Sequence, residues 1–125
     1  MSCKVLVADD EAVITNVVAK KLRNAGLNVI VAMDGQEAYE RAAAERPDVL
    51  ITDLQMPGMS GLELCARLTA ELPEPIATIL LTAKGFEIER SQIDSLPILR
   101  VMTKPFSPRE LLASVWEALG VCAAS

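Results

Sequence analysis

The chain has 125 residues, a hydrophobic fraction of 51% and a formal net charge of −5, which suit one compact domain and argue against intrinsic disorder. An acidic chain without a Lys/Arg stripe among aromatic residues gives no basis for direct nucleic-acid binding. Histidine is absent, so the chain carries no phosphohistidine relay of its own, and any phosphoryl donor must be another molecule.

Two strand–helix pairs are expected in the first part of the chain. Residues 4–8 are apolar and rich in Val, and the run stops at a pair of carboxylates, which predicts a strand buried on both faces. Residues 12–25 have helical spacing, with Gly26 as the stop. Residues 28–32 predict a second strand, and residues 34–45 predict a helix that begins with a capping Asp. The apolar positions of the first helix are Val13, Val17, Val18, Leu22 and Ala25.

The middle of the chain repeats the pattern. Residues 49–53 predict a third strand, again apolar until a terminal carboxylate. Residues 60–63 form a capping box, which opens a third helix that ends before Pro73. Residues 76–82 predict a fourth strand, and residues 86–95 a weak fourth helix. Its few apolar anchors are Ile88 and Ile93.

The last elements complete an alternating α/β pattern. Residues 99–103 predict a fifth strand, and a capping box at residues 107–110 opens the final helix, with Pro108 at its first helical position. Strand and helix alternate throughout without a linker or repeat, which predicts one α/β domain over residues 1–125. Its doubly wound parallel sheet would have helices on both faces and bind ligands at the carboxyl ends of the strands. The final helix carries the apolar residues Leu111, Leu112, Val115, Trp116 and Leu119.

Chemically reactive side chains stand at four of these strand ends. Asp9 and Asp10 follow the first strand and Asp53 ends the third. Thr82 ends the fourth strand and Lys104 follows the fifth. The carboxyl ends of parallel strands share one edge, so these groups can converge. Three carboxylates in one cleft repel each other and require a cation, and Mg²⁺ prefers such oxygen ligands. Asp53 can then attack a phosphoryl group to form an aspartyl phosphate, while Lys104 neutralises the developing charge.

Each of these residues also has an ordinary structural interpretation. Asp10 can cap the first helix and Asp53 can cap a loop turn. Thr82 can satisfy a nearby backbone group, and Lys104 can be a solvated charge. Their common position at strand ends favours the chemical interpretation.

Four segments resemble the response-regulator receiver domains, the CheY-like family of two-component signalling. They read VADDE, DLQMPGMSG, LTAK and TKPF, at residues 7–11, 53–61, 81–84 and 103–106. The resemblance extends over nearly the whole chain. It implies a single receiver domain with the flavodoxin-like strand order 2-1-3-4-5.

The resemblance also assigns metal ligands and a phosphoacceptor. It implies that Asp9, Asp10 and Asp53 hold Mg²⁺, with a backbone carbonyl of Gln55 as a further ligand. Asp53 is then the phosphoacceptor. These roles belong to a signalling module rather than to a turnover enzyme.

Further residues are expected to control the phosphorylated state. By the resemblance, Thr82 is a switch hydroxyl and Lys104 pairs with the phosphoryl group or Asp53. Gln55 and Lys84 each stand two residues beyond a site residue, so we expect them to tune the lifetime of the phosphoryl group.

Two departures from the family pattern concern how the signal leaves the site. Val101 stands three residues before the lysine, where receivers usually carry Tyr or Phe, and residues 97–98 read Pro-Ile instead of Gly-Ala. A β-branched Val cannot turn inward as a ring does. We therefore expect the switch to involve Gly85, which permits backbone rearrangement, and Phe86, the nearest aromatic residue in sequence.

The expected partners are a sensor histidine kinase or phosphotransfer protein, and a downstream effector or fused output domain. Neither a membrane span nor a disulfide framework is expected, which agrees with a cytoplasmic, reducing location. The final helix lacks a basic residue that paired transcription-factor receivers use, so a monomer is favoured. The open alternatives are a degenerate receiver that binds proteins without phosphorylation, a flavin-binding module and a phosphatase with an aspartate nucleophile.

Overall fold

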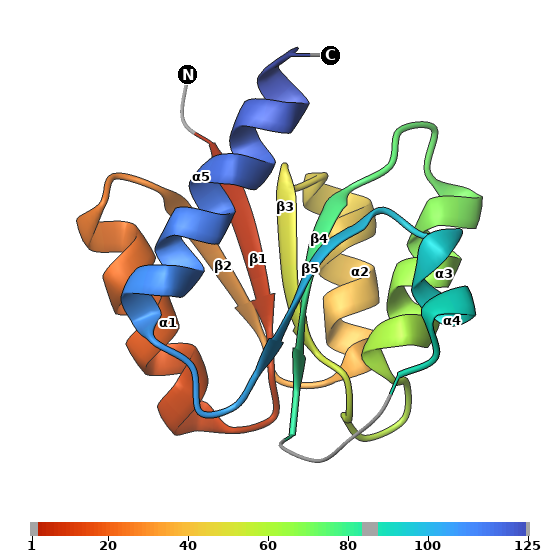
Figure 1. The fold of residues 1–125 in the computed structure, drawn as a ribbon, viewed down its shortest axis with the longest axis horizontal. Coiled ribbons are helices and arrows are strands. Elements are labelled where there is room, and N and C mark those ends of the chain that lie inside the picture. The colour runs from red at the N-terminus through yellow and green to blue at the C-terminus, as the bar shows by residue number, and fades with distance from the viewer. Residues whose placement is uncertain (1–2, 84–87, 125) are drawn as a thin grey trace.

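A computed structural model describes residues 3–83 and 88–124. In this part of the chain, parallel strands form one sheet in the order β2-β1-β3-β4-β5 (Figure 1), which confirms the predicted doubly wound α/β fold. The elements are β1 (Lys4–Ala8), α1 (Ala12–Asn24), β2 (Asn28–Ala32), α2 (Gly35–Glu45), β3 (Val49–Asp53), α3 (Gly61–Glu71), β4 (Ala77–Thr82), α4 (Arg90–Asp94), β5 (Ile98–Thr103) and α5 (Pro108–Ala124).

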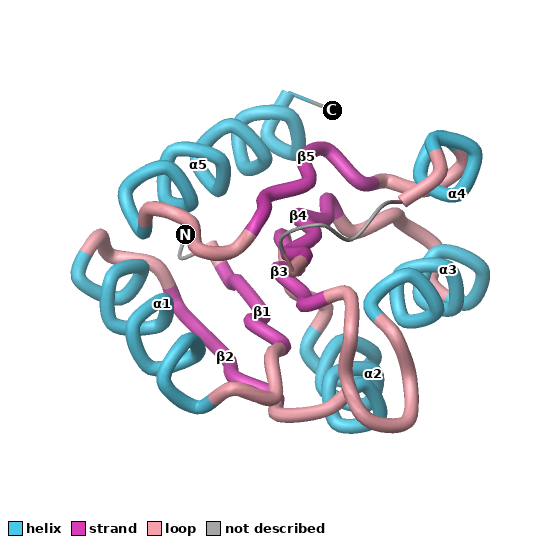
Figure 2. The backbone as a smooth tube through the Cα atoms, turned by 60° about the horizontal axis from the view of Figure 1, so that its bottom comes forward, coloured by secondary structure: helices cyan, strands magenta, loops and turns pink. Residues whose placement is uncertain are grey.

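The helices cover the sheet in two layers. Helices α1 and α5 lie on one face, and α2, α3 and α4 lie on the other (Figure 2). The first layer encloses the larger apolar core, which includes Val7, Ile51 and Leu81, and the second encloses a smaller core around Leu6 and Leu50. The residues of β3 and β4 are buried on both faces, which explains why their sequences are continuous apolar runs.

The predicted helix starts are confirmed for α2, α3 and α5. Asp34 Oδ1 accepts a hydrogen bond from the Glu37 N–H at 2.8 Å, and Ser60 Oγ accepts from the Glu63 N–H at 3.1 Å. At α5, Ser107 Oγ accepts from the N–H three residues on at 3.4 Å. These bonds satisfy backbone donors that have no partner inside the helix.

Helix α1 differs from the prediction. Val13 and Val17 are 75% and 48% exposed, whereas the polar Thr15 is buried. The N-cap of α1 is Glu11, so the capping interpretation of Asp10 is wrong. In α5, Trp116 is likewise exposed while the other apolar positions face the core.

Helix α4 is shorter than predicted. It begins at Arg90, so Ile88 and Glu89 lie outside it, and the predicted start at Phe86 lies outside the described residues. None of its residues is buried, because Ile93, the one predicted anchor inside the helix, is only partly buried. The helix therefore covers β5 only weakly.

Strand β5 lies at the edge of the sheet and contains a bulge. Ile98 pairs with Thr78 and Arg100 pairs with Ile79, so Leu99 is an extra residue in the ladder. This bulge follows the Pro-Ile step at which receivers usually have Gly-Ala. Bulges at edge strands redirect side chains and hinder pairing with other chains.

The described part of the chain contains no helix with both the length and the apolar character needed to cross a lipid bilayer.

Candidate functional site

The sheet brings the reactive residues of the sequence together at its carboxyl edge, the lower edge in Figure 1. Asp9 directly follows β1, Asp53 is the last residue of β3, and Lys104 directly follows β5. The strand order reverses at this point, because β1 is flanked by β2 on one side and β3 on the other. Parallel α/β sheets bind their ligands at such switch points.

Three carboxylates form the centre of the site. Asp9, Asp10 and Asp53 each offer an oxygen such that all three atoms lie within 4.8 Å of one another. Asp9 is fully buried, Asp53 is nearly so, and Asp10 lies exposed at the rim. Three hard oxygen donors at this spacing suit a small divalent cation with several retained waters.

The Lys104 ammonium group compensates part of this negative charge. Lys104 Nζ lies 2.9 Å from Asp9 Oδ2, 3.3 Å from Asp53 Oδ2 and 3.0 Å from Glu11 Oε1. Asp9 Oδ2 is fully buried and has no well-directed hydrogen bond, so the ammonium holds it as an ion pair. That oxygen is chemically suited to bind a second cation.

Burial and charge shift the protonation equilibria of the site in a definite direction. Desolvation, and then the neighbouring Asp9 carboxylate, raise the pKa of Asp53 above its ordinary value, although Lys104 opposes the shift. Burial alone would lower the pKa of Lys104, but the carboxylates around it outweigh burial and hold that pKa above its ordinary value. Lys104 is therefore a permanent cation in the neutral pH range.

Main-chain hydrogen bonds orient the charged groups. Asp9 Oδ1 accepts from the Glu11 N–H at 2.9 Å, and Asp53 Oδ1 accepts from the Gln55 N–H at 3.4 Å. The Lys104 N–H donates to the Thr82 carbonyl at 2.7 Å, which ties the lysine to the end of β4. The Gln55 side chain is exposed at the rim, whereas Thr82 is buried.

Sequence reasoning missed two contributors. The Glu11 carboxylate reaches Lys104, a contact between residues 93 positions apart that no local pattern indicates. A Cβ on Gly61 would lie 2.4 Å from the Asp53 carbonyl oxygen, so the first residue of α3 must be glycine, which has no Cβ. The signal for Gly61 is its place in the capping box and in the DLQMPGMSG segment, but neither pattern indicates a contact with Asp53.

The expected switch and tuning residues are only partly described. Val101 pairs with Leu80 on the face that carries α3 and α4, and it is partly exposed rather than packed in the core. Lys84, Gly85 and Phe86 lie outside the described residues.

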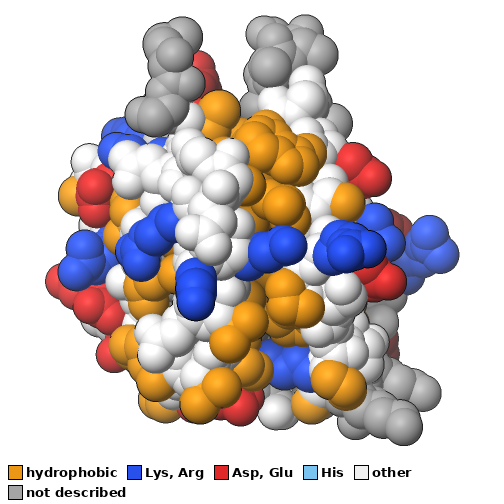
Figure 3. All heavy atoms as spheres, turned by 90° about the vertical axis from the view of Figure 1, so that its left-hand side faces the viewer, with side chains coloured by type: hydrophobic (Ala, Val, Ile, Leu, Met, Phe, Trp, Pro, Cys, Tyr) orange, Lys and Arg blue, Asp and Glu red, His pale blue; other side chains and the backbone are white. Residues whose placement is uncertain are grey.

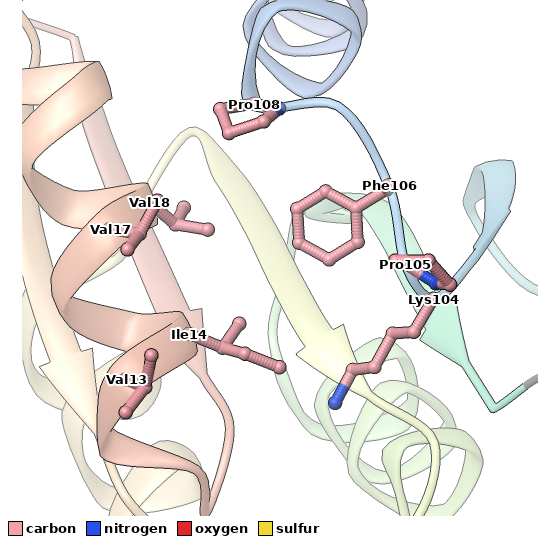
Figure 4. A pocket seen from close by; sticks show the side chains of 8 residues that line it. All are labelled: Val13, Ile14, Val17, Val18, Lys104, Pro105, Phe106 and Pro108. Carbon is pink, nitrogen blue, oxygen red and sulfur yellow. The ribbon is translucent and has the colours of Figure 1, made fainter.

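An apolar cavity of about 180 Å³ adjoins the charged site. Figure 4 shows side chains of α1 facing Phe106 and Pro108 across it, with Lys104 lining its wall. Lys104 thus borders both the cavity and the carboxylates. On the side of the molecule that α1 covers, Lys and Arg side chains lie among hydrophobic ones (Figure 3). The α1 residues of the cavity are Val13, Ile14, Val17 and Val18.

Comparison with known proteins decides the family. The sequence model of the response regulator receiver domain matches residues 5–116. The chain belongs to the response regulator receiver family. It is 40% identical over 116 residues to the alkaline phosphatase synthesis transcriptional regulatory protein PhoP of Bacillus subtilis, covering 92% of this chain and 48% of PhoP. The receiver chain thus spans about half the length of that relative.

Solved receiver structures agree with this family. The Francisella response regulator 1452 receiver domain has a TM-score of 0.84 at 31% identity, covering 94% of this chain and 96% of that one. The chemotaxis protein CheY4 of Vibrio cholerae has a TM-score of 0.83 at 30% identity, covering 94% and 99%.

Family membership fixes the general role. The chain is a phosphoacceptor receiver module of two-component signalling, and the alternative of a phosphorylation-independent binding module is not favoured. Receiver domains interact with histidine kinases and output domains, and they typically use Mg²⁺ at an acidic pocket. In this chain, Asp9, Asp10 and Asp53 form an acidic cluster.

Proposed function

We propose that Asp53 accepts a phosphoryl group from a histidine kinase or phosphotransfer protein in a Mg²⁺-dependent reaction, and that residues 1–125 act as one receiver domain. The supporting observation is the position of the Asp53 carboxylate between the Lys104 ammonium and the carboxylates of Asp9 and Asp10. A nucleophile surrounded by a cation and by oxygen ligands for a second cation is suited to phosphoryl transfer.

The metal site consists of the carboxylates of Asp9, Asp10 and Asp53, with the Gln55 backbone carbonyl as a further ligand. Asp9 Oδ2 supports this assignment, because it is buried and accepts no well-directed hydrogen bond, although Lys104 Nζ lies 2.9 Å away. A metal ion would give that oxygen a better-directed partner than the ammonium group does. When bound, Mg²⁺ supplies positive charge that neutralises the phosphoryl oxygens.

The chain's own groups carry the transfer. An oxygen of Asp53 bonds to phosphorus as the P–N bond of the donor's phosphohistidine breaks, and the departing imidazole nitrogen retains the electron pair. Lys104 then pairs with the phosphoryl oxygens in the partly buried site, where such a contact is worth about 2–4 kcal/mol. Thr82, at the adjacent strand end, responds to the phosphoryl group as a switch hydroxyl.

Signal output and lifetime involve residues around this centre. Gln55 and Lys84 tune the rate of hydrolysis, and Gly85 with Phe86 rearranges in place of the aromatic ring that Val101 replaces. The exposure of Val101 supports this reading, since an exposed Val on an edge strand leaves no core volume to be filled by a turning ring.

The donor protein docks on α1 and the β5–α5 connection. The cavity between α1 and Phe106 begins at Lys104, so a partner seated there would hold its phosphoryl group beside Asp53. Exposed Val13 and Val17 suit a partner with an apolar helix surface, and the Lys and Arg side chains on this side suit an acidic rim around that surface.

A cytoplasmic location, a downstream effector or fused output domain and a monomeric state complete the proposal.

Incubation with acetyl phosphate and Mg²⁺ tests this function without a kinase. We expect incorporation of one phosphoryl group by the wild-type chain, none by Asp53→Asn, and none when EDTA replaces Mg²⁺. Glu117→Gln, a change at an exposed residue of α5 whose carboxylate lies 4.0 Å from Arg100, serves as the control and should incorporate normally. Equal incorporation by Asp53→Asn and the wild type would contradict the proposal.

A further inference from the structure

Glu11 lacks the side-chain hydrogen bond that a residue at the start of a helix often makes. It is the N-cap residue of α1, yet its side chain makes no capping hydrogen bond. The N-cap residues of α2 and α3, Asp34 and Ser60, both accept such a bond. Departures from a local rule of this kind tend to occur where a residue has another role.

The Glu11 carboxylate is directed at Lys104 instead. Its Oε1 lies 3.0 Å from Nζ, and the Glu11 side chain is 59% exposed while that of Lys104 is only 15% exposed. Glu11 thus approaches the ammonium from the solvent side. Its backbone N–H also donates to Asp9 Oδ1, so the residue contacts both Asp9 and Lys104.

The set of carboxylates around Lys104 differs in one residue from the set that forms the candidate metal site. Lys104 contacts Asp9, Glu11 and Asp53, whereas the cluster of converging oxygens consists of Asp9, Asp10 and Asp53. A cation bound to the cluster would draw on Asp9 and Asp53, both of which Lys104 now contacts. Of the three carboxylates that Lys104 contacts, Glu11 alone would keep its oxygens for the ammonium.

We propose that Glu11 is a positioning residue that holds Lys104 beside the phosphoacceptor when a cation occupies the carboxylate cluster. The proposal rests on the proposed function. It states that Glu11 holds the Lys104 ammonium group in place when Mg²⁺ occupies the site. Lysine has a flexible four-carbon stem, so an unanchored ammonium would sample many conformations. Anchoring it keeps the charge in place before the phosphoryl group arrives.

Glu11→Gln removes the charge but keeps the length of the side chain, and Glu11→Asp keeps the charge but shortens the reach. With saturating Mg²⁺ and acetyl phosphate, we expect both variants to be phosphorylated about 3- to 5-fold more slowly than the wild type, the size of an exposed ion-pair effect. A wild-type rate in Glu11→Gln, or in Glu11→Asp, would overturn the proposal.

A double-mutant cycle tests whether the effect passes through Lys104. In a Lys104→Met background, Glu11→Gln should cause no further slowing, because the group it positions is gone. An equal slowing in both backgrounds would overturn the proposal. It would mean that the Glu11 charge affects the reaction without acting through Lys104.

A readout independent of phosphorylation separates this inference from the proposed function. In the ¹⁵N NMR spectrum of the Mg²⁺-saturated protein at low temperature, the protected Lys104 ammonium signal should be present in the wild type and lost in Glu11→Gln. Lys104→Met identifies the signal. Persistence of the signal in Glu11→Gln would overturn the proposal even if Asp53 is phosphorylated as expected.

Discussion

Gly61 offers a sharp test of how the fold supports Asp53. A Cβ at this position would lie 2.4 Å from the Asp53 carbonyl oxygen and 3.0 Å from Leu80 Cδ1, where ordinary contacts begin at 3.4 Å. The closer neighbour is backbone at the end of a buried central strand, so it cannot move aside as a flexible side chain would. Gly61→Ala must therefore displace Asp53 or the start of α3 by a large fraction of an ångström.

The magnitude follows from two opposing effects. Overpacking a well-packed site costs about 1–3 kcal/mol, while replacing Gly with Ala recovers about 0.4–1 kcal/mol by restricting the unfolded chain. We expect a net loss of about 1–2 kcal/mol in the free energy of unfolding. A displacement approaching 1 Å at the nucleophile should also slow phosphorylation by about 10- to 100-fold.

Urea unfolding followed by circular dichroism, in EDTA, measures the stability, and acetyl phosphate measures the rate. Gly120→Ala is the matched control, because a Cβ at Gly120 in α5 meets nothing within 4 Å. That variant should gain about 0.5–1 kcal/mol and react normally. A Gly61→Ala protein as stable and as reactive as Gly120→Ala would refute the reasoning.

Three further predictions concern charge and docking. Lys104→Met should tighten Mg²⁺ binding by about 3- to 10-fold, because the ammonium group and the metal ion compete for Asp9. The same change should destabilise the phosphorylated state. Calorimetry that shows weaker Mg²⁺ binding would contradict this prediction. The pKa of Asp53 is raised in the folded protein, so folding favours the neutral carboxyl group. Its contribution to the free energy of unfolding is fully present below the ordinary carboxyl pKa and is lost as pH rises through the raised pKa. Asp53→Asn should thus stabilise the metal-free protein near pH 7 by about 1 kcal/mol or more and lose that advantage in acid, whereas an equal gain at both pH values would exclude burial of this charge as the cause. Val17→Asp should impair transfer from a kinase but not from acetyl phosphate, and Leu99→Asp, at a residue that is also 48% exposed, should impair neither.

Local sequence patterns were sufficient to predict the strands and the acidic centre. Residues 49–53 are a β-branched and aliphatic run that stops at a carboxylate, and this pattern marks both a buried strand and its carboxyl end. Parallel pairing then places Asp9 and Asp53 at one edge without further information. The site residues could be found because topology, rather than side-chain detail, brings them together.

Long-range contacts and exposed faces could not be predicted in the same way. The periodicity of α1 shows that Val13 and Val17 are apolar, but it does not show that the neighbouring elements leave them uncovered. The contact of Glu11 with Lys104 joins residues 93 positions apart in the chain and has no local signature. Likewise, the extra residue Leu99 in β5 depends on its pairing with β4, which no pattern within the strand specifies.

The location of the phosphoryl group is the most direct test of the central claim. Tandem mass spectrometry of peptides from the protein, taken after reaction with acetyl phosphate and Mg²⁺ and trapping of the acyl phosphate, identifies the modified residue. The account predicts one modified side chain, Asp53, with Asp9 and Asp10 unmodified. A phosphoryl group on any other residue, with Asp53 unmodified, would contradict it.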